Sequence, residues 1–65
     1  MEILTWQARN AKNVSLVKLS QLTGIAKSTL NNIENGKVFP TIKQLELIAI
    51  ALGVYISDLY ESEYK

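Results

Sequence analysis

The chain has 65 residues, a hydrophobic fraction of 48%, a formal net charge of +1, and neither cysteine nor histidine. This length allows one domain, near the size at which a core alone gives marginal stability. Without cysteine or histidine, disulfides, thiolate zinc sites and the commonest general base are excluded. No apolar run reaches the roughly 18 to 20 residues of a membrane span, and no signal-peptide pattern is present. We therefore expect a cytoplasmic protein with no membrane segment, cofactor or metal.

The charges are distributed unevenly. Residues 1–45 contain six basic and two acidic residues, whereas residues 46–65 contain four acidic residues and one lysine. A basic footprint on one side is what phosphate binding requires, and this modest one predicts modest affinity per monomer. No phosphate loop, metal cluster or pair of nucleophile and base is visible, so we do not expect an enzyme.

The first predicted element is a helix over residues 2–11. Leu4, Ala8 and Ala11 are spaced i, i+4 and i+7, which places them on one helical face. Trp6 has two interpretations, a half-buried aromatic at the core or its edge, and a contact with a partner.

A second helix is expected to follow Ser15, whose hydroxyl can accept a hydrogen bond from a free N–H of the first helical turn. Leu16, Leu19 and Leu22 then lie at i, i+3 and i+6 on one face. Gly24 ends this helix, because a residue without Cβ adopts the left-handed conformation at no steric cost.

A third helix is predicted over residues 26–35, after Ile25 returns to the core, with Leu30 and Ile33 inward and Gly36 at its end. Its other side chains are mostly short, uncharged donors and acceptors, which are poor helix formers. They are Lys27, Ser28, Thr29, Asn31, Asn32 and Asn35. A face that only contacts water more commonly carries Glu, Lys, Gln and Ala. We therefore favour a recognition helix presented to base edges over a solvated face.

The last elements follow a loop that ends at Pro40. A fourth helix over residues 41–52 begins with Thr41 as cap and has Gly53 at its end. A short fifth helix begins near Ser57, a candidate cap. The expected buried residues are Ile42, Leu45, Ile48, Ala49 and Leu52 in the fourth helix, then Val54, Ile56 and Leu59. Apolar residues outside this stripe form a patch of the kind that marks an interface, and they are Leu47, Ile50, Tyr55 and Tyr60.

Short motifs occur in order along nearly the whole chain. They are Leu19-Ser20, Thr23-Gly24-Ile25, Ser28-Thr29-Leu30, Ile33-Glu34-Asn35-Gly36-Lys37, Pro40-Thr41, and Ile48-Ala49 through Ala51-Leu52-Gly53-Val54. This ordered set resembles the helix-turn-helix domain of the Cro/C1 phage-repressor type, or XRE family. The resemblance implies an all-α, compact five-helix, lambda-repressor-like fold. It covers residues 1–65 as a single domain, with the helix-turn-helix core at about 15–36.

The resemblance also implies roles for individual residues. Arg9 pairs with Glu34 and orients the recognition helix, the alternative being contact with solvent or phosphate. The implied base contacts are Lys27, Ser28 and Asn32. The implied DNA backbone or flanking contacts are Thr29, Asn31, Asn35, Lys37, Thr41, Lys43 and Lys18, with a merely solvated charge as the alternative for Lys43. The sequence departs from the family at Leu16, where many members carry Gln, and at Thr5 and Ala8, where large aliphatic residues are usual.

The function implied is a sequence-specific transcriptional regulator, a repressor that binds a palindromic operator in double-stranded DNA. The family docks two copies through the end that holds Leu47, Ile50, Tyr55 and Tyr60, so both recognition helices of a homodimer enter successive major grooves. An alternative is a protein-interaction module on the same fold, such as an antirepressor or antitoxin with a protein partner. A binder of structured RNA is disfavoured, because the chain lacks exposed aromatic platforms for stacking unpaired bases.

Overall fold

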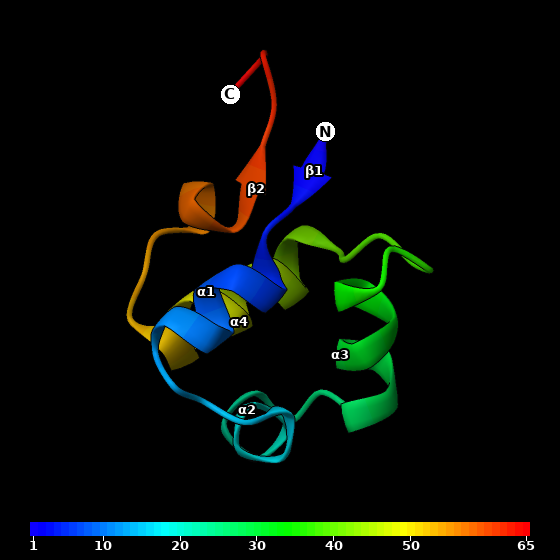
Figure 1. Ribbon diagram of the computed structural model, residues 1–65, viewed down its shortest axis with the longest axis vertical. Coiled ribbons are helices and arrows are strands. Elements are labelled where there is room, and N and C mark those ends of the chain that lie inside the picture. Colours follow the sequence, from blue (N-terminus) through cyan, green and yellow to red (C-terminus); the bar gives the residue numbers. More distant parts are fainter.

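The computed structural model describes residues 1–65 and arranges the helices around one core, with the two chain ends close together at a short sheet (Figure 1). Two antiparallel strands make this sheet, in which Glu2 lies opposite Glu61 and Ile3 opposite Tyr60. The elements in order are β1 Glu2–Ile3, α1 Thr5–Ala11, α2 Leu16–Thr23, α3 Lys27–Glu34, α4 Ile42–Leu52, the 3₁₀ turn η1 Ile56–Leu59, and β2 Tyr60–Glu61. None of the helices combines the length and hydrophobicity that crossing a membrane requires.

The prediction of a helix beginning at residue 2 is wrong. The first residues are extended because they pair with β2, and the backbone N–H of Leu4 donates to the carbonyl of Leu59 at 2.8 Å. The predicted apolar face is also only partly right, since Ala11 is exposed and Thr5 is the buried residue of α1. Trp6 is more than half exposed, whereas Leu59 is fully buried and belongs to the core against which Ala8 of α1 packs.

Helix α2 begins and ends as predicted. The Ser15 hydroxyl accepts a hydrogen bond from the N–H of Lys18, and Gly24 ends the helix with a φ of 75°. Leu19 is fully buried, but Leu22 is half exposed, contrary to the prediction. Thr23, one turn after Leu19, takes the buried position instead, which rotates the core-facing side away from Leu22.

Helix α4 begins with a capping box, in which Thr41 and Gln44 each accept a hydrogen bond from the other's backbone N–H. Four of the five residues predicted to be buried are buried, namely Leu45, Ile48, Ala49 and Leu52. The fifth, Ile42, is 73% exposed, because it occupies the first helical position and the core begins one turn later.

The predicted fifth helix is a 3₁₀ turn, and its cap is not Ser57. The carboxylate of Asp58 accepts a hydrogen bond from the backbone N–H of Tyr55 at 2.9 Å and so fixes the start of the turn. Leu59 is buried at its end, as predicted, before the chain enters β2. The molecule therefore has four α-helices rather than five, and the all-helical class is confirmed apart from the short sheet.

The core joins residues from α2, α3, α4 and η1. Its members are Leu19, Leu30, Leu45, Ile48, Ala49, Leu52 and Leu59. Helix α3 contributes Leu30 to this cluster and also buries Ile33, which confirms the predicted inner face. Because both residues lie on one side of α3, the opposite side of that helix is left open to solvent.

Candidate nucleic-acid interface

The turn between α2 and α3 is held by two hydroxyl groups. The Thr23 hydroxyl donates to the carbonyl of Leu19 at 2.8 Å and accepts from the N–H of Ile25 at 3.1 Å. The Ser20 hydroxyl donates to the carbonyl of Ile25 at 2.6 Å. These bonds set the angle at which α3 leaves α2. Neither hydroxyl was predicted to have a role, although a threonine beside a helix-ending glycine such as Gly24 is a usable signal in the sequence.

The outward face of α3 is a row of polar side chains. Ser28, Asn31 and Asn35 are exposed and Asn32 is half-buried, at spacings of three, four and seven residues from Ser28. These spacings place them on one face of the helix, opposite the buried Leu30 and Ile33. Such a row offers hydroxyl and amide groups that can pair with the donors and acceptors of base edges.

The beginning of α3 is also open. Ala26 precedes the helix and provides no side-chain cap, so the first backbone N–H groups of α3 have no partner from that side chain. Lys27 is exposed at this end, and Thr29 is half-buried at its margin. The predicted base contacts Lys27 and Ser28 are therefore accessible, and Asn32, one turn further on, is partly so.

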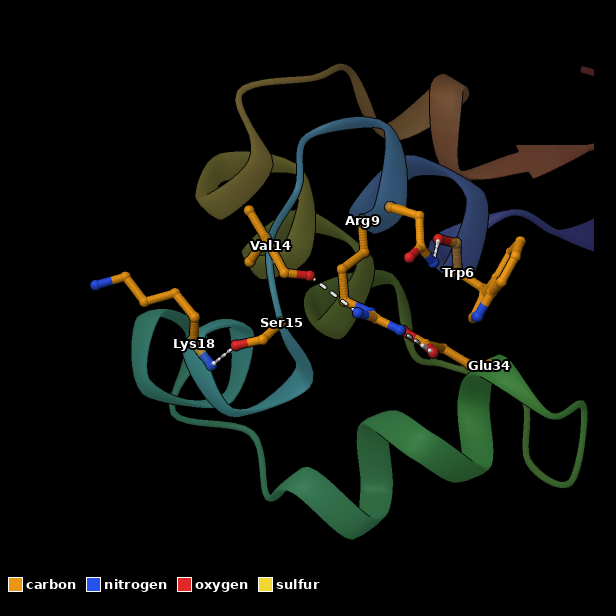
Figure 2. A network of polar contacts seen from close by, with 7 residues as sticks. Trp6, Arg9, Val14, Ser15, Lys18 and Glu34 are labelled. Carbon is orange, nitrogen blue, oxygen red and sulfur yellow. Dashed lines mark hydrogen bonds and ion pairs between the residues drawn. The ribbon is translucent and has the colours of Figure 1, made fainter.

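Arg9 links α1, the segment before α2, and the end of α3 (Figure 2). Its Nε and Nη2 donate to the two carboxylate oxygens of Glu34 at 2.6 and 3.0 Å, and its Nη1 donates to the carbonyl of Val14 at 2.9 Å. The side chains of Arg9 and Glu34 are only 12% and 3% exposed. Donating hydrogen bonds to the Glu34 carboxylate raises the pKa of the Arg9 guanidinium. Glu34 lies at the negative end of the α3 dipole, so its carboxylate needs this cation.

The basic side chains expected near a phosphate backbone are all exposed. Lys18 lies on α2, Lys37 follows α3, and Lys43 lies in the first turn of α4. Asn35, at the end of α3, is exposed as well. The hydroxyl oxygen of Thr41 is engaged in the capping box, yet its own proton remains free to donate to an anion. Gln44, the other half of that box, was not singled out from the sequence.

The predicted interface residues divide between two places. Ile50 and Tyr55, which are 72% and 80% exposed, border a hollow of about 560 Å³ at the end of α4. Leu47 is half-buried and does not line it. Tyr60 is also half-buried and lines a different hollow near the chain ends, where the Lys65 ammonium lies 5.5 Å from its ring centroid. The structure therefore brings together only Ile50 and Tyr55 of this set.

No group of three or more His, Cys, Asp or Glu side chains is placed to hold a metal ion. The shielded charges are those of Arg9 and Glu34, which neutralise each other in a closed pair.

Comparison with known proteins places the fold in a family. The family described as helix-turn-helix matches residues 7–59. Two solved structures of the N-terminal DNA-binding domain of SinR from Bacillus subtilis, described in one case as the master biofilm-regulator, have TM-scores of 0.80 and 0.74. Each is 32% identical and covers 94% of this chain and 90% of the other. A search of curated protein sequences gives no match. The chain belongs to the helix-turn-helix family of the XRE type.

Proposed function

We propose that this protein is a sequence-specific DNA-binding transcription regulator in which α3 enters the major groove of duplex DNA. The observation that carries the proposal is the outward row of Ser28, Asn31, Asn32 and Asn35 on a helix braced from behind. A major groove admits one α-helix and displays a distinct pattern for each base pair. The DNA-binding function named for the similar SinR domain supports the same assignment.

Base recognition is assigned to Lys27, Ser28 and Asn32. A lysine at the start of the helix can donate to guanine, and an asparagine amide can pair with N6 and N7 of adenine. Ser28 can donate or accept and is the more permissive partner. Thr29 and Asn31 flank these side chains and are assigned contacts with phosphate or with the thymine methyl group, and Asn35 is assigned a contact with phosphate.

Contacts with the DNA backbone fix how the protein sits on the duplex. We assign them to exposed groups around α3, namely Lys18, Lys37, Thr41 and Lys43. Such contacts are insensitive to sequence and release counterions, so they make affinity fall as salt rises. The Arg9–Glu34 pair contributes indirectly, because it holds α3 at a fixed angle to the rest of the domain.

Two copies are proposed to bind a palindromic operator as a homodimer and to repress by occupying it. The exposed Ile50 and Tyr55 supply the proposed dimer surface, whereas Leu47 and Tyr60 do not line the same hollow. In a symmetric pair the two α3 helices enter major grooves about 34 Å apart on one face of the duplex. The test is sedimentation at micromolar concentration, in which monomer alone with and without DNA refutes the dimer.

A second candidate function is a protein-interaction module, as in an antirepressor or antitoxin. The observation in its favour is the hollow beside Ile50 and Tyr55, which could hold a protein partner instead of a second copy. This candidate predicts partner binding that persists without DNA.

Binding-site selection from a random duplex pool at near-physiological salt tests the main proposal. Enrichment of a two-fold symmetric sequence with half-sites about one helical turn apart is the expected result. The selected duplex is then titrated against a scrambled one. Absence of any enrichment contradicts the proposal and favours the interaction module.

A further inference from the structure

The loop between α3 and α4 and the first turn of α4 carry large apolar side chains that the core does not use. Phe39 and Ile42 are 75% and 73% exposed, and Val38 is 45% exposed. Exposed Lys37 precedes these residues and exposed Lys43 follows them. An apolar segment enclosed by two cations matches the surface of a nucleic-acid backbone, where apolar sugar edges alternate with phosphates.

Both ends of this loop are fixed by hydrogen bonds. The backbone N–H groups of Lys37 and Val38 donate to the carbonyl of Asn32 at 2.9 and 3.4 Å, and Gly36 makes the turn with a φ of 74°. At the other end, the capping box holds Thr41. The loop is therefore preorganised, and little conformational entropy is lost when its tip makes a contact.

The loop projects past α3 on the side away from α1 and α4 (Figure 1). This is the side toward which the polar row of α3 faces, since Leu30 and Ile33 face the core. A duplex that receives α3 in its major groove therefore has one of its flanking backbones beside the loop.

The inner side of the loop is a poor site for an anion. There Val38 and Phe39 border a hollow of about 380 Å³ whose lining also includes Glu2, which is exposed, and Glu34, the partner of Arg9. A phosphate in this hollow would meet the negative charge of Glu2, since that of Glu34 is neutralised by Arg9. Lys37 and Lys43, which flank this loop in the sequence, are exposed and supply charge complementary to phosphate.

We propose that Phe39 is a positioning residue for DNA, packing on a deoxyribose of the backbone that flanks the α3 groove, between phosphates held by Lys37 and Lys43. This inference rests on the proposed function and deepens it. Packing on sugar is independent of base identity, so Phe39 strengthens binding to every duplex by a similar amount.

The test compares Phe39→Ala with Tyr64→Ala, which removes an almost fully exposed aromatic near the C-terminal end. The expected loss for Phe39→Ala is about five- to tenfold in affinity, equal for the selected duplex and a scrambled one. The salt dependence should keep its slope, because no counterion-releasing contact is removed. Phe39→Leu should recover part of the loss, and Tyr64→Ala should bind like the wild type.

Photocrosslinking gives a second, independent measurement that does not depend on truncating the side chain. The photoreactive analogue p-benzoylphenylalanine at position 39 should crosslink to a deoxyribose of the DNA. The same analogue at position 64 should not crosslink to DNA. If the wild type binds duplex DNA but Phe39→Ala binds equally well, or position 39 gives no crosslink, the inference fails and the proposed function stands. A Phe39→Ala defect in self-association instead of DNA binding also overturns it. If the wild type binds no duplex at all, the proposed function itself fails.

Discussion

The two faces of α3 are built from different kinds of interaction. The inner face is held by Leu30, Ile33 and the shielded bidentate pair of Glu34 with Arg9. The outer face carries short polar side chains that make no hydrogen bond to the rest of the protein, as at Ser28 and Asn31. We therefore expect substitutions on the inner face to change the free energy of unfolding, and substitutions on the outer face to change only DNA binding.

The largest expected effect is that of Arg9→Ala, on the inner face. It leaves the carboxylate of Glu34 shielded and unpaired at the negative end of α3, at a cost of about 3 kcal/mol. A domain of this size has roughly 3 to 5 kcal/mol in total, so the variant should keep only about 0 to 2 kcal/mol and unfold at much lower urea than the wild type. Urea denaturation followed by circular dichroism measures this. Lys12→Ala, which removes an exposed cation just after α1, is the matched control and should unfold like the wild type.

The outer face should respond in the opposite way to Asn32→Ala. Unfolding should change little, but discrimination between the selected duplex and scrambled DNA should fall by about 1 to 3 kcal/mol, because a paired base edge loses its partner. Titration of both duplexes with the same protein preparation measures the difference. An equal loss on both duplexes would show that Asn32 does not read bases.

The same substitution at two buried threonines, one on α1 and one on α2, compares a hydroxyl that has no hydrogen-bond partner with one that has two. The Thr5 hydroxyl is buried without a hydrogen-bond partner, so Thr5→Val should raise the free energy of unfolding by about 1 kcal/mol. The Thr23 hydroxyl makes two hydrogen bonds in the α2–α3 turn, so Thr23→Val should lower it by a similar or larger amount. Urea midpoints that move in the same direction for both variants would contradict this account.

The sequence predicts those structural features that depend on residues close together in the chain, and it does not predict those that depend on distant residues. Local signals marked both ends of α2, since Ser15 is a cap and Gly24 a left-handed stop, and both predictions are confirmed. The prediction that the first helix begins at residue 2 was wrong, because residues 2 and 3 form β1. Their extended conformation depends on pairing with Tyr60 and Glu61 at the other end of the chain. No local pattern near residue 2 contains that information.

Burial was predicted well in the middle of helices and poorly at their edges. Leu22 and Ile42 fit the helical period, but periodicity gives the direction of a side chain and does not show where neighbouring elements stop covering it. At the candidate site, the sequence supplied the outward polar residues of α3. It missed the hydroxyl and capping contacts of Ser20, Thr23 and Gln44, because these depend on backbone geometry that the turn itself creates.

The smallest effect is expected for Lys37→Ala. This substitution in the loop after α3 measures the ionic contribution to DNA binding. Lys37 is exposed, so stability should not change, and binding should weaken uniformly for selected and scrambled duplexes. Because one phosphate contact is removed, the slope of log affinity against log salt should become shallower by about 1. Titrations at several salt concentrations measure this slope, and an unchanged slope would place Lys37 off the DNA. Read together with Phe39→Ala, which should weaken binding at constant slope, the result separates the ionic from the apolar part of one loop.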